Sequence, residues 1–373
     1  MITRPDEPAF SRFTTALNCR EPDRVPLFEV LVDNKIKAQI IGREIATPQD
    51  DVEFWVTAGY DYVPLMPRGL DFSWVSGYYD TEGAGAQRQT GESEWGHLKE
   101  GPYSSTGELS DIRWAEEQKG FISTSEEFDD FVWPTYDDID FSQFSEVRDI
   151  MPKNMKAICL METGHTVSWY LMGLETYMLT LKHDPELYRK VMDKVCGLTY
   201  LALDKGLSQE DIGAVVLLDD LGYKTGPMVN PACYREYLFP WFKKLNDLCR
   251  SKGVPCILHS CGDQSRLIED FVEVGFKGLH PIMPSAAVMR IDDVRKQVDG
   301  RLCLIGNIDL EYTLTQGSRD EVEALVKARI KTIAPGGGYI LSSGNSIPAY
   351  VRVENYVAMI EACFKYGRYP ISL

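Results

Sequence analysis

A histidine and a cysteine two residues apart, His259 and Cys261, form the pattern in this sequence with the clearest chemistry. They follow the short apolar run 254–258, which predicts a buried strand ending in the polar stretch His259-Ser-Cys-Gly-Asp263. In parallel α/β folds, ligands bind at the carboxyl ends of strands. Imidazole and thiolate are both good zinc ligands, so the pair predicts part of a metal site. The alternative is a buried pair that holds no metal.

Polar side chains also follow the other apolar runs of the chain. A carboxylate would complete a zinc shell, and the candidates, which are also our candidate catalytic acids, are Glu29, Glu162, Asp219 and Asp220. The residues expected to bind substrate are Arg68, His165, Asn307 and Asn345. Since barrel mouths are polar in any case, each of these residues has an alternative role as a hydrogen-bonding scaffold. His280 lies inside an apolar run and is expected to be a core histidine.

The elements that must position these side chains repeat as strand, helix, strand. Eight apolar runs predict strands at 25–30, 61–66, 156–161, 214–218, 255–259, 278–281, 302–306 and 338–342. Helical periodicity predicts helices at 175–182, 185–205, 231–252, 264–274 and 319–334, and Thr47 with Pro48 predicts the start of another that runs to about residue 58. This repeat predicts an α/β fold, a (β/α)8 TIM barrel. A doubly wound open sheet is the alternative.

One interval, 67–154, is too long for a single loop of the repeat. It is rich in glycine and tryptophan, and we expect an inserted subdomain, built of hairpins, between the second and third strands. The chain 1–373 is then a single barrel domain with this insertion covering the barrel mouth. A packing flap without ligand contact is the alternative for the insertion.

Composition limits the partners of the protein. The formal net charge of −17 argues against nucleic acid or an anionic membrane surface. No apolar run approaches the roughly 20 residues needed to cross a bilayer, and the start of the chain does not read as a secretory signal, so we expect a cytoplasmic protein. The nine cysteines lack a disulfide-like spacing, and those within apolar runs are expected to be reduced core residues. Association into a homo-oligomer is left open.

Several motifs spread over nearly the whole chain resemble the uroporphyrinogen decarboxylase superfamily. The stretches that carry the resemblance are Arg20-Glu-Pro-Asp-Arg-Val-Pro26, Ser93-Glu-Trp-Gly96, Asp219-Asp-Leu-Gly222, His259-Ser-Cys-Gly262, Gly306-Asn-Ile-Asp309 and Pro335-Gly-Gly-Gly-Tyr-Ile-Leu341. The superfamily shares a (β/α)8 barrel and includes corrinoid-dependent methyltransferases. The motifs are specific for the superfamily and not for one activity.

Two departures from the family patterns narrow the resemblance. Uroporphyrinogen decarboxylases carry an Arg-Gln-Ala-Gly-Arg segment after the first strand for a polycarboxylate substrate, whereas this chain has Glu29-Val-Leu-Val-Asp33. Acids there would repel that substrate. The thiol-methylating members bind zinc with a His-x-Cys pair and a second Cys after the last strand. This chain keeps His259 and Cys261 but has Asn345 in place of the second Cys.

The resemblance therefore implies a methyltransferase of a corrinoid system, with zinc as its metal. It would move a methyl group between a small methyl donor, such as a methyl ether, and a corrinoid carried by a separate partner protein. One alternative is a decarboxylase of another carboxylate, using Asp219 and a basic contact such as Arg68. A non-catalytic, ligand-binding member of the superfamily is a further alternative.

Overall fold

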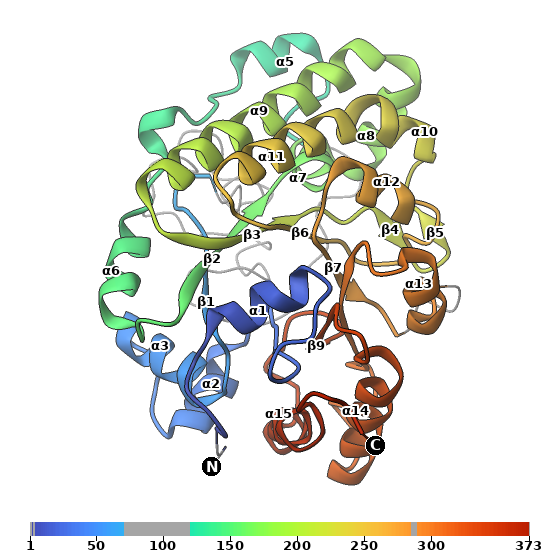
Figure 1. Cartoon of the computed structure of the whole chain (residues 1–373). Helices are drawn as coiled ribbons and strands as arrows, with labels where there is room; N and C mark the ends of the chain where they lie inside the picture. The colour runs from blue at the N-terminus through green and yellow to red at the C-terminus, as the bar shows by residue number, and fades with distance from the viewer. Residues whose placement is uncertain (1, 3, 71–119, 285–288, 373) are drawn as a thin grey trace.

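Seven parallel strands form one curled sheet in the computed structural model of the chain, which describes residues 2, 4–70, 120–284 and 289–372 (Figure 1). The order across the sheet is β1-β2-β3-β6-β7-β8-β9. The strands are β1 (Tyr62–Leu65), β2 (Lys156–Glu162), β3 (Ile212–Leu218), β6 (Cys256–His259), β7 (Gly278–Ile282), β8 (Cys303–Ile308) and β9 (Tyr339–Ser343). A two-stranded antiparallel hairpin, β4 (Gly222–Tyr223) and β5 (Gly226–Pro227), follows β3. The architecture is α/β and TIM-barrel-like.

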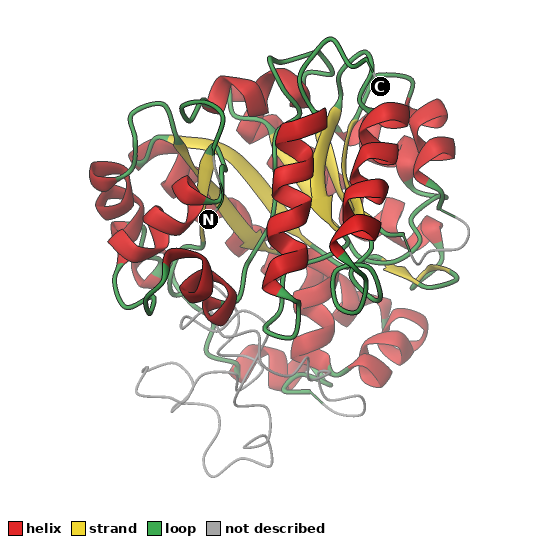
Figure 2. Ribbon diagram, turned by 90° about the horizontal axis from the view of Figure 1, so that it is seen from below, coloured by secondary structure: helices red, strands yellow, loops and turns green. Residues whose placement is uncertain are grey.

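Helices return the chain from the end of each strand to the start of the next and pack around the outside of the sheet (Figure 2). They are α1 (Phe10–Leu17), α2 (Asn34–Ile41), α3 (Pro48–Thr57), α5 (Ser125–Asp130), α6 (Ser142–Ile150), α7 (Gly164–Met172), α8 (Leu174–His183), α9 (Pro185–Gln209), α10 (Pro231–Cys233), α11 (Phe239–Ser251), α12 (Ile268–Val274), α13 (Ile291–Val298), α14 (Arg319–Ile333) and α15 (Val353–Tyr366). Short 3-10 and π-helical turns occupy η1 (Tyr136–Asp138) and η2 (Tyr234–Leu238).

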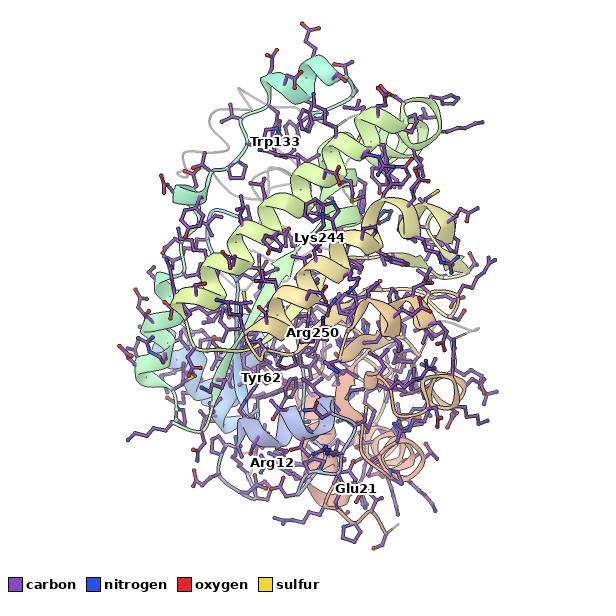
Figure 3. The ribbon with its side chains drawn as sticks, turned by 45° about the horizontal axis from the view of Figure 1, so that its top comes forward. Arg12, Glu21, Tyr62, Trp133, Lys244 and Arg250 are labelled. Atoms are coloured by element: carbon purple, nitrogen blue, oxygen red, sulfur yellow. The ribbon has the colours of Figure 1, made fainter. Side chains whose placement is uncertain are left out.

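The helices bury one face and expose the other, as α11 shows. Leu245 and Leu248 are buried, whereas Lys244 and Arg250 lie on the exposed face of α11 (Figure 3). The predicted start of α3 is confirmed, because the Thr47 hydroxyl accepts a hydrogen bond from the backbone N–H of Asp50 in a capping box. Among the described residues, none of the helices combines the length and apolar character needed to span a membrane.

The prediction of a continuous strand at 25–30 was wrong. Leu27 makes an isolated bridge with Leu341 of β9, and Val32, beyond the predicted run, makes another with Ile347. Pro26 has no N–H to donate to a ladder, which explains the interruption. On its other side, the hydroxyl of Tyr62 on β1 lies 2.7 Å from both the backbone N and the backbone O of Glu29. The segment thus links the two edge strands of the curled sheet.

The insertion predicted at 67–154 is described only in part, because 71–119, which include the motif Ser93-Glu-Trp-Gly96, lie outside the described residues. Its described portion from residue 120 onward contains α5, η1 and α6, so the expectation of hairpins was wrong there. The single predicted helix at 231–252 is also divided, into α10, η2 and α11. Pro240 lies in that interval and cannot donate a backbone hydrogen bond, which favours a break in the regular ladder.

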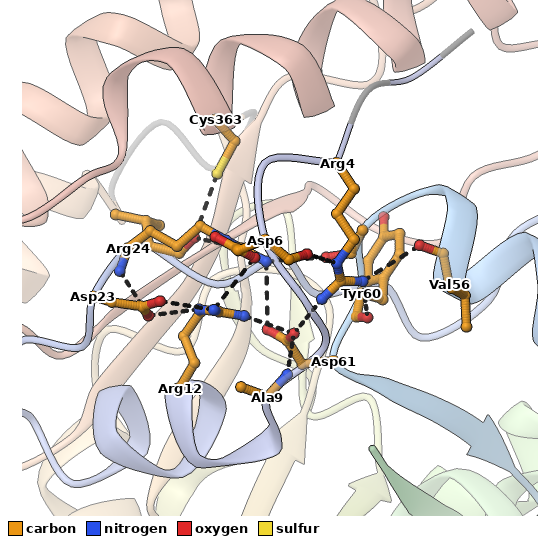
Figure 4. Close-up of polar contacts among 12 residues, drawn as sticks. Arg4, Asp6, Ala9, Arg12, Asp23, Arg24, Val56, Tyr60, Asp61 and Cys363 are labelled. Atoms are coloured by element: carbon orange, nitrogen blue, oxygen red, sulfur yellow. Dashed lines mark hydrogen bonds and ion pairs between the residues drawn. The ribbon is translucent and has the colours of Figure 1, made fainter. Parts of the chain in front are cut away.

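A group of ion pairs, the N-terminal ion cluster, lies at the end of the sheet where β1 begins (Figure 4). Its members are Arg4, Asp6, Arg12, Asp23, Arg24 and Asp61. Asp61 Oδ1 accepts hydrogen bonds from Arg4 Nη2 at 2.8 Å and from Arg12 Nη1 at 2.7 Å, and the Asp61 side chain is 1% exposed. Arg12 also binds Asp23 through two nitrogens, at 2.6 and 2.7 Å. These contacts join the N-terminal segment to β1.

Candidate functional site

The carboxyl ends of two neighbouring strands, β3 and β6, hold the chemistry that the sequence singles out. Leu218 lies opposite His259 in the parallel register, and the backbone N–H of Asp219 donates to the carbonyl of His259 at 2.9 Å. The loops that follow these strands are therefore adjacent. This pairing brings Asp220 beside His259 and Cys261.

Asp220, His259 and Cys261 form the candidate metal centre. Their donor atoms all lie within 4.8 Å of one another. His259 Nε2 is 3.6 Å from Cys261 Sγ and 3.9 Å from Asp220 Oδ1. Two ligands at ordinary zinc distances and a tetrahedral angle are roughly 3.5 Å apart, so the donor types and spacing fit a zinc ion. Three protein ligands would leave a fourth position for substrate or water, as catalytic zinc sites do.

Backbone hydrogen bonds hold Asp220 in place. Its own N–H donates to the Thr166 hydroxyl at 2.7 Å, and its Oδ1 accepts from the backbone N–H of Cys261 at 2.8 Å. The next residue, Leu221, donates its N–H to the Ser260 hydroxyl at 2.9 Å. The loops after β3 and β6 are thus bonded directly to each other, which fixes the carboxylate relative to the cysteine.

Cys261 lies within reach of the Asn345 side chain. Asn345 Nδ2 is 3.3 Å from Cys261 Sγ, so its amide N–H donates to the sulfur. Burial and the nearby Asp220 carboxylate raise the pKa of Cys261 well above its usual range, and the Asn345 amide acts in the opposite direction. A cation at this position would reverse that balance, because a coordinating thiol is deprotonated outright.

Asp219 has a different role from its neighbour. Its two oxygens accept backbone hydrogen bonds from His165, at 3.0 Å, and Thr166, at 2.7 Å, in the first turn of α7. Burial raises the pKa of Asp219 to about 8, against the effect of these N–H donors. Through these two backbone hydrogen bonds the Asp219 side chain anchors the first turn of α7 to the end of β3.

A small polar pocket opens beside the candidate metal centre. The residues that line it are Glu162, Thr166, Tyr170, Leu218, Asp219, Asp220 and His259. Glu162 is the last residue of β2 and is 5% exposed. The described residues that line the pocket include no lysine or arginine. Sequence reasoning missed Thr166 and Tyr170, which lie one turn apart on α7, the helix that follows β2.

His165, predicted to bind substrate, lies among tyrosines. Its Nδ1 is 2.7 Å from the Tyr177 hydroxyl, and its Nε2 is 3.5 Å from the Tyr234 hydroxyl. Burial lowers the pKa of His165 to about 3, so the ring is neutral. Tyr234 begins η2 and donates its hydroxyl hydrogen to the carbonyl of Leu221 at 2.9 Å. His165 thus supports the loop that carries Asp220.

The remaining predicted residues lie outside the candidate metal centre. Asn307 donates from Nδ2 to the carbonyl of Ile282 at 2.7 Å, which supports the end of β7. Arg68 is exposed, and its backbone pairs with Asp140. Glu29 is fully buried and accepts hydrogen bonds from Ser343 N at 2.9 Å and Ser343 Oγ at 2.6 Å. Burial raises the pKa of Glu29 to about 8.

The fold and the donor cluster together define a TIM-barrel-like α/β protein with a candidate metal centre at the carboxyl ends of its strands. The family model for uroporphyrinogen decarboxylase (URO-D) matches residues 142–366, more than half of the chain, and the chain belongs to this family. The resemblance seen in the motifs is thereby confirmed.

Individual relatives fall into two groups. The chain is 23% identical to a methylcobamide:CoM methyltransferase, MtaA, of Methanosarcina barkeri, over 59% of this chain and 61% of that protein. It is 27% identical to a uroporphyrinogen decarboxylase of Anaeromyxobacter dehalogenans, over 35% of this chain and 36% of that protein. The match to the first relative thus spans about three fifths of that protein's length.

Among solved structures, a methyltransferase from Methanosarcina mazei superposes with a TM-score of 0.68 at 16% identity. The match covers 96% of this chain and 99% of that structure. At this identity the likeness concerns the fold alone, and it supports the TIM-barrel-like architecture over an open doubly wound sheet.

Proposed function

We propose that the protein is a methyltransferase of a corrinoid-dependent system. It moves a methyl group between a small methyl donor, such as a methyl ether, and the corrinoid of a separate protein. The observation that carries this proposal is the Asp220, His259 and Cys261 cluster at the carboxyl ends of β3 and β6. Family membership and the methylcobamide:CoM methyltransferases among the relatives support it.

Transfer of a methyl group from a methyl ether requires the site to stabilise the departing oxygen. When a methyl group leaves a methyl ether as an electrophile, the bonding electron pair stays on oxygen, which then needs positive charge or a proton. A zinc ion held by Asp220, His259 and Cys261 would supply Lewis-acid polarisation of that oxygen. The donor types and spacing described above fit such an ion.

The side chains around the candidate metal centre have separate tasks in this proposal. Asn345 stabilises negative charge on the Cys261 sulfur through its amide N–H. Glu162 lines the same pocket as Asp220 and His259, where it is placed to hold a proton for the departing oxygen. Tyr170 and Leu218 also line the pocket, where their apolar surface would limit the access of water to the leaving group.

The decarboxylase alternative requires a basic contact for a substrate carboxylate. Arg68, the residue predicted for that contact, is exposed, and no lysine or arginine is among the described residues that line the pocket. Both observations favour methyl transfer.

Metal content of the purified protein tests the proposal. We expect about one zinc per chain in the wild type and loss of that zinc in Cys261→Ser, because the thiolate is a ligand. Cys233→Ser is the matched control, since Cys233 is partly exposed as Cys261 is but lies outside the cluster. The same three proteins are then assayed for methyl transfer from methyl ethers to a reduced corrinoid protein.

Each outcome of this experiment has a defined meaning. Zinc and methyl transfer that are both lost in Cys261→Ser and retained in Cys233→Ser support the proposal. Release of carbon dioxide from a carboxylate substrate would identify a decarboxylase instead. Tight ligand binding without turnover would identify a non-catalytic member of the family.

A further inference from the structure

A second buried histidine contacts the histidine of the candidate metal centre. His280 on β7 lies opposite His259 on β6 in the parallel register, and the two Nδ1 atoms are 2.8 Å apart. Both side chains are buried. A contact of this length between ring nitrogens is a hydrogen bond, so one nitrogen carries the proton and the other accepts it.

The contact continues away from the candidate metal centre. His280 Nε2 is 3.0 Å from the Ser342 hydroxyl on β9. The Ser342 side chain is in turn a hydrogen-bond partner of the Glu29 carboxyl group. We call His259, His280, Ser342 and Glu29 the buried relay. Its members come from β6, β7, β9 and the irregular segment that links the sheet edges.

The number of protons available allows the hydrogen bonds of the buried relay to be donated in either of two directions. A neutral imidazole has one N–H, and a buried imidazolium without a paired charge is costly. In the first direction, His259 donates from Nδ1 to His280, His280 donates from Nε2 to Ser342, and His259 Nε2 keeps a free lone pair. In the reverse direction, His280 donates to His259, and His259 Nε2–H points toward Cys261 and Asp220, where it blocks a cation.

The far end of the buried relay selects between the two directions. Glu29 Oε1 accepts a hydrogen bond from the backbone N–H of Ser343 at 2.9 Å, and a carboxyl group keeps such an acceptor oxygen when it is protonated. A Ser342 hydroxyl that donates to this acceptor has its oxygen lone pairs available for His280 Nε2–H. Phe28 packs edge-on against the His280 ring, with centroids 4.9 Å apart, and so restricts the ring orientation.

We propose that His280, supported by Ser342 and Glu29, is a positioning residue that fixes His259 as the Nδ1–H tautomer, leaving Nε2 free to bind a cation. This inference rests on the proposed metal-dependent function and names the residues that prepare its ligand. Outer partners of metal-bound histidines typically orient the ring in this way, and their loss costs about 10–100-fold in metal affinity.

Nitrogen-15 NMR of histidine-labelled, metal-free full-length protein tests the tautomers directly. The chain has five histidines, so the imidazole signals can be assigned with single variants. We expect His259 to carry its proton on Nδ1 and His280 to carry its proton on Nε2. The reverse pattern, with a proton on His259 Nε2, would overturn the proposal.

Zinc affinity, measured by competition with a chelator, tests the consequence for the ligand. His280→Phe removes the acceptor and should weaken zinc binding by about 10–100-fold. His280→Asn places an amide oxygen near the position of Nδ1 and should retain most of the affinity. Tyr60→Phe is the matched control, because it removes a buried hydrogen bond, to Tyr356, that lies outside the relay.

The two readouts separate this inference from the proposed function. If wild-type protein binds no zinc, the metal-dependent function fails, whereas the tautomer spectra still decide the direction of the relay. If zinc and methyl transfer are present but His280→Phe matches the affinity of the control, the relay has no positioning role. If His280→Phe does not fold, Ser342→Ala replaces it, with a tautomer change at His280 as the expected result.

Discussion

The two ends of the curled sheet carry polar clusters of opposite character. In the N-terminal ion cluster, three arginines face three aspartates, and Asp61 alone receives Arg4 and Arg12 at 2.8 and 2.7 Å. At the carboxyl ends of the strands, Asp220 lies beside a neutral histidine and a thiol, and no arginine or lysine lines the pocket among the described residues. A cluster with matched charges stabilises the fold, whereas one with unmatched ligands is suited to bind a cation.

The largest expected effect comes from a substitution that breaks the ion pairs of the N-terminal ion cluster. Asp61→Asn removes the charge shared by the buried guanidinium groups, and breaking a buried ion pair costs about 3–5 kcal/mol. We expect the free energy of unfolding, measured by urea denaturation, to fall by that amount while zinc content stays at the wild-type level. A loss of zinc in a folded Asp61→Asn protein would contradict the separation of the two clusters.

The corresponding substitution in the candidate metal centre, at the carboxyl ends of the strands, is Asp220→Asn. The amide oxygen still accepts from the Cys261 N–H, so the metal-free fold should keep its stability. Zinc affinity should fall by at least about tenfold, since even an outer partner of a ligand is worth about 10–100-fold. The measurement is chelator competition beside a thermal melt of the metal-free protein. Unchanged affinity would remove Asp220 from the ligand set.

A pH-dependent effect concerns Glu29, a buried acid of the relay. Its pKa is raised from 4.5 to about 8 by burial, so the folded state holds an extra proton between these pH values. The protonated group stabilises the fold below pH 4.5, and this contribution is lost as the pH rises to 8. Relative to Glu29→Gln, we expect wild-type stability to fall by up to about 1.4 kcal/mol per pH unit in this window.

Unfolding by urea at several pH values measures this difference. Asp219 has a similarly raised pKa, but it is present in both proteins and its effect cancels in the comparison. Parallel pH profiles for the wild type and Glu29→Gln would show that Glu29 is ionised in the folded protein.

The strands of the sheet were largely predictable, because buried parallel strands read as continuous apolar runs. Seven of the eight predicted runs correspond to strands of the sheet. The run at 25–30 failed because an apolar pattern does not register the missing N–H of Pro26 or the Tyr62 side chain that contacts Glu29. The helical content from residue 120 onward was missed because tryptophan and glycine content does not distinguish hairpins from short helices.

In the candidate site, the pair His259 and Cys261 was predictable from its place at a strand end. The third member was not, since four acids were equally suitable by type. The structure distinguishes Asp219 from Asp220 because successive residues point in different directions, so one carboxylate meets the α7 N-terminus and the other meets Cys261. His280 was correctly predicted as buried, but its contact with His259 depends on strand register, which one sequence does not reveal.

The π-helical turn η2 has a consequence for how this region can vary in length. Successive residues of an α-helix are about 100° apart around its axis. The wider turn at Tyr234–Leu238 therefore accommodates one additional residue while Tyr234 still reaches the carbonyl of Leu221. Deleting a single residue there would restore regular winding but would rotate Tyr234 away from the loop of Asp220. A change of one residue in the length of this turn therefore costs the hydrogen bond between the Tyr234 hydroxyl and the carbonyl of Leu221.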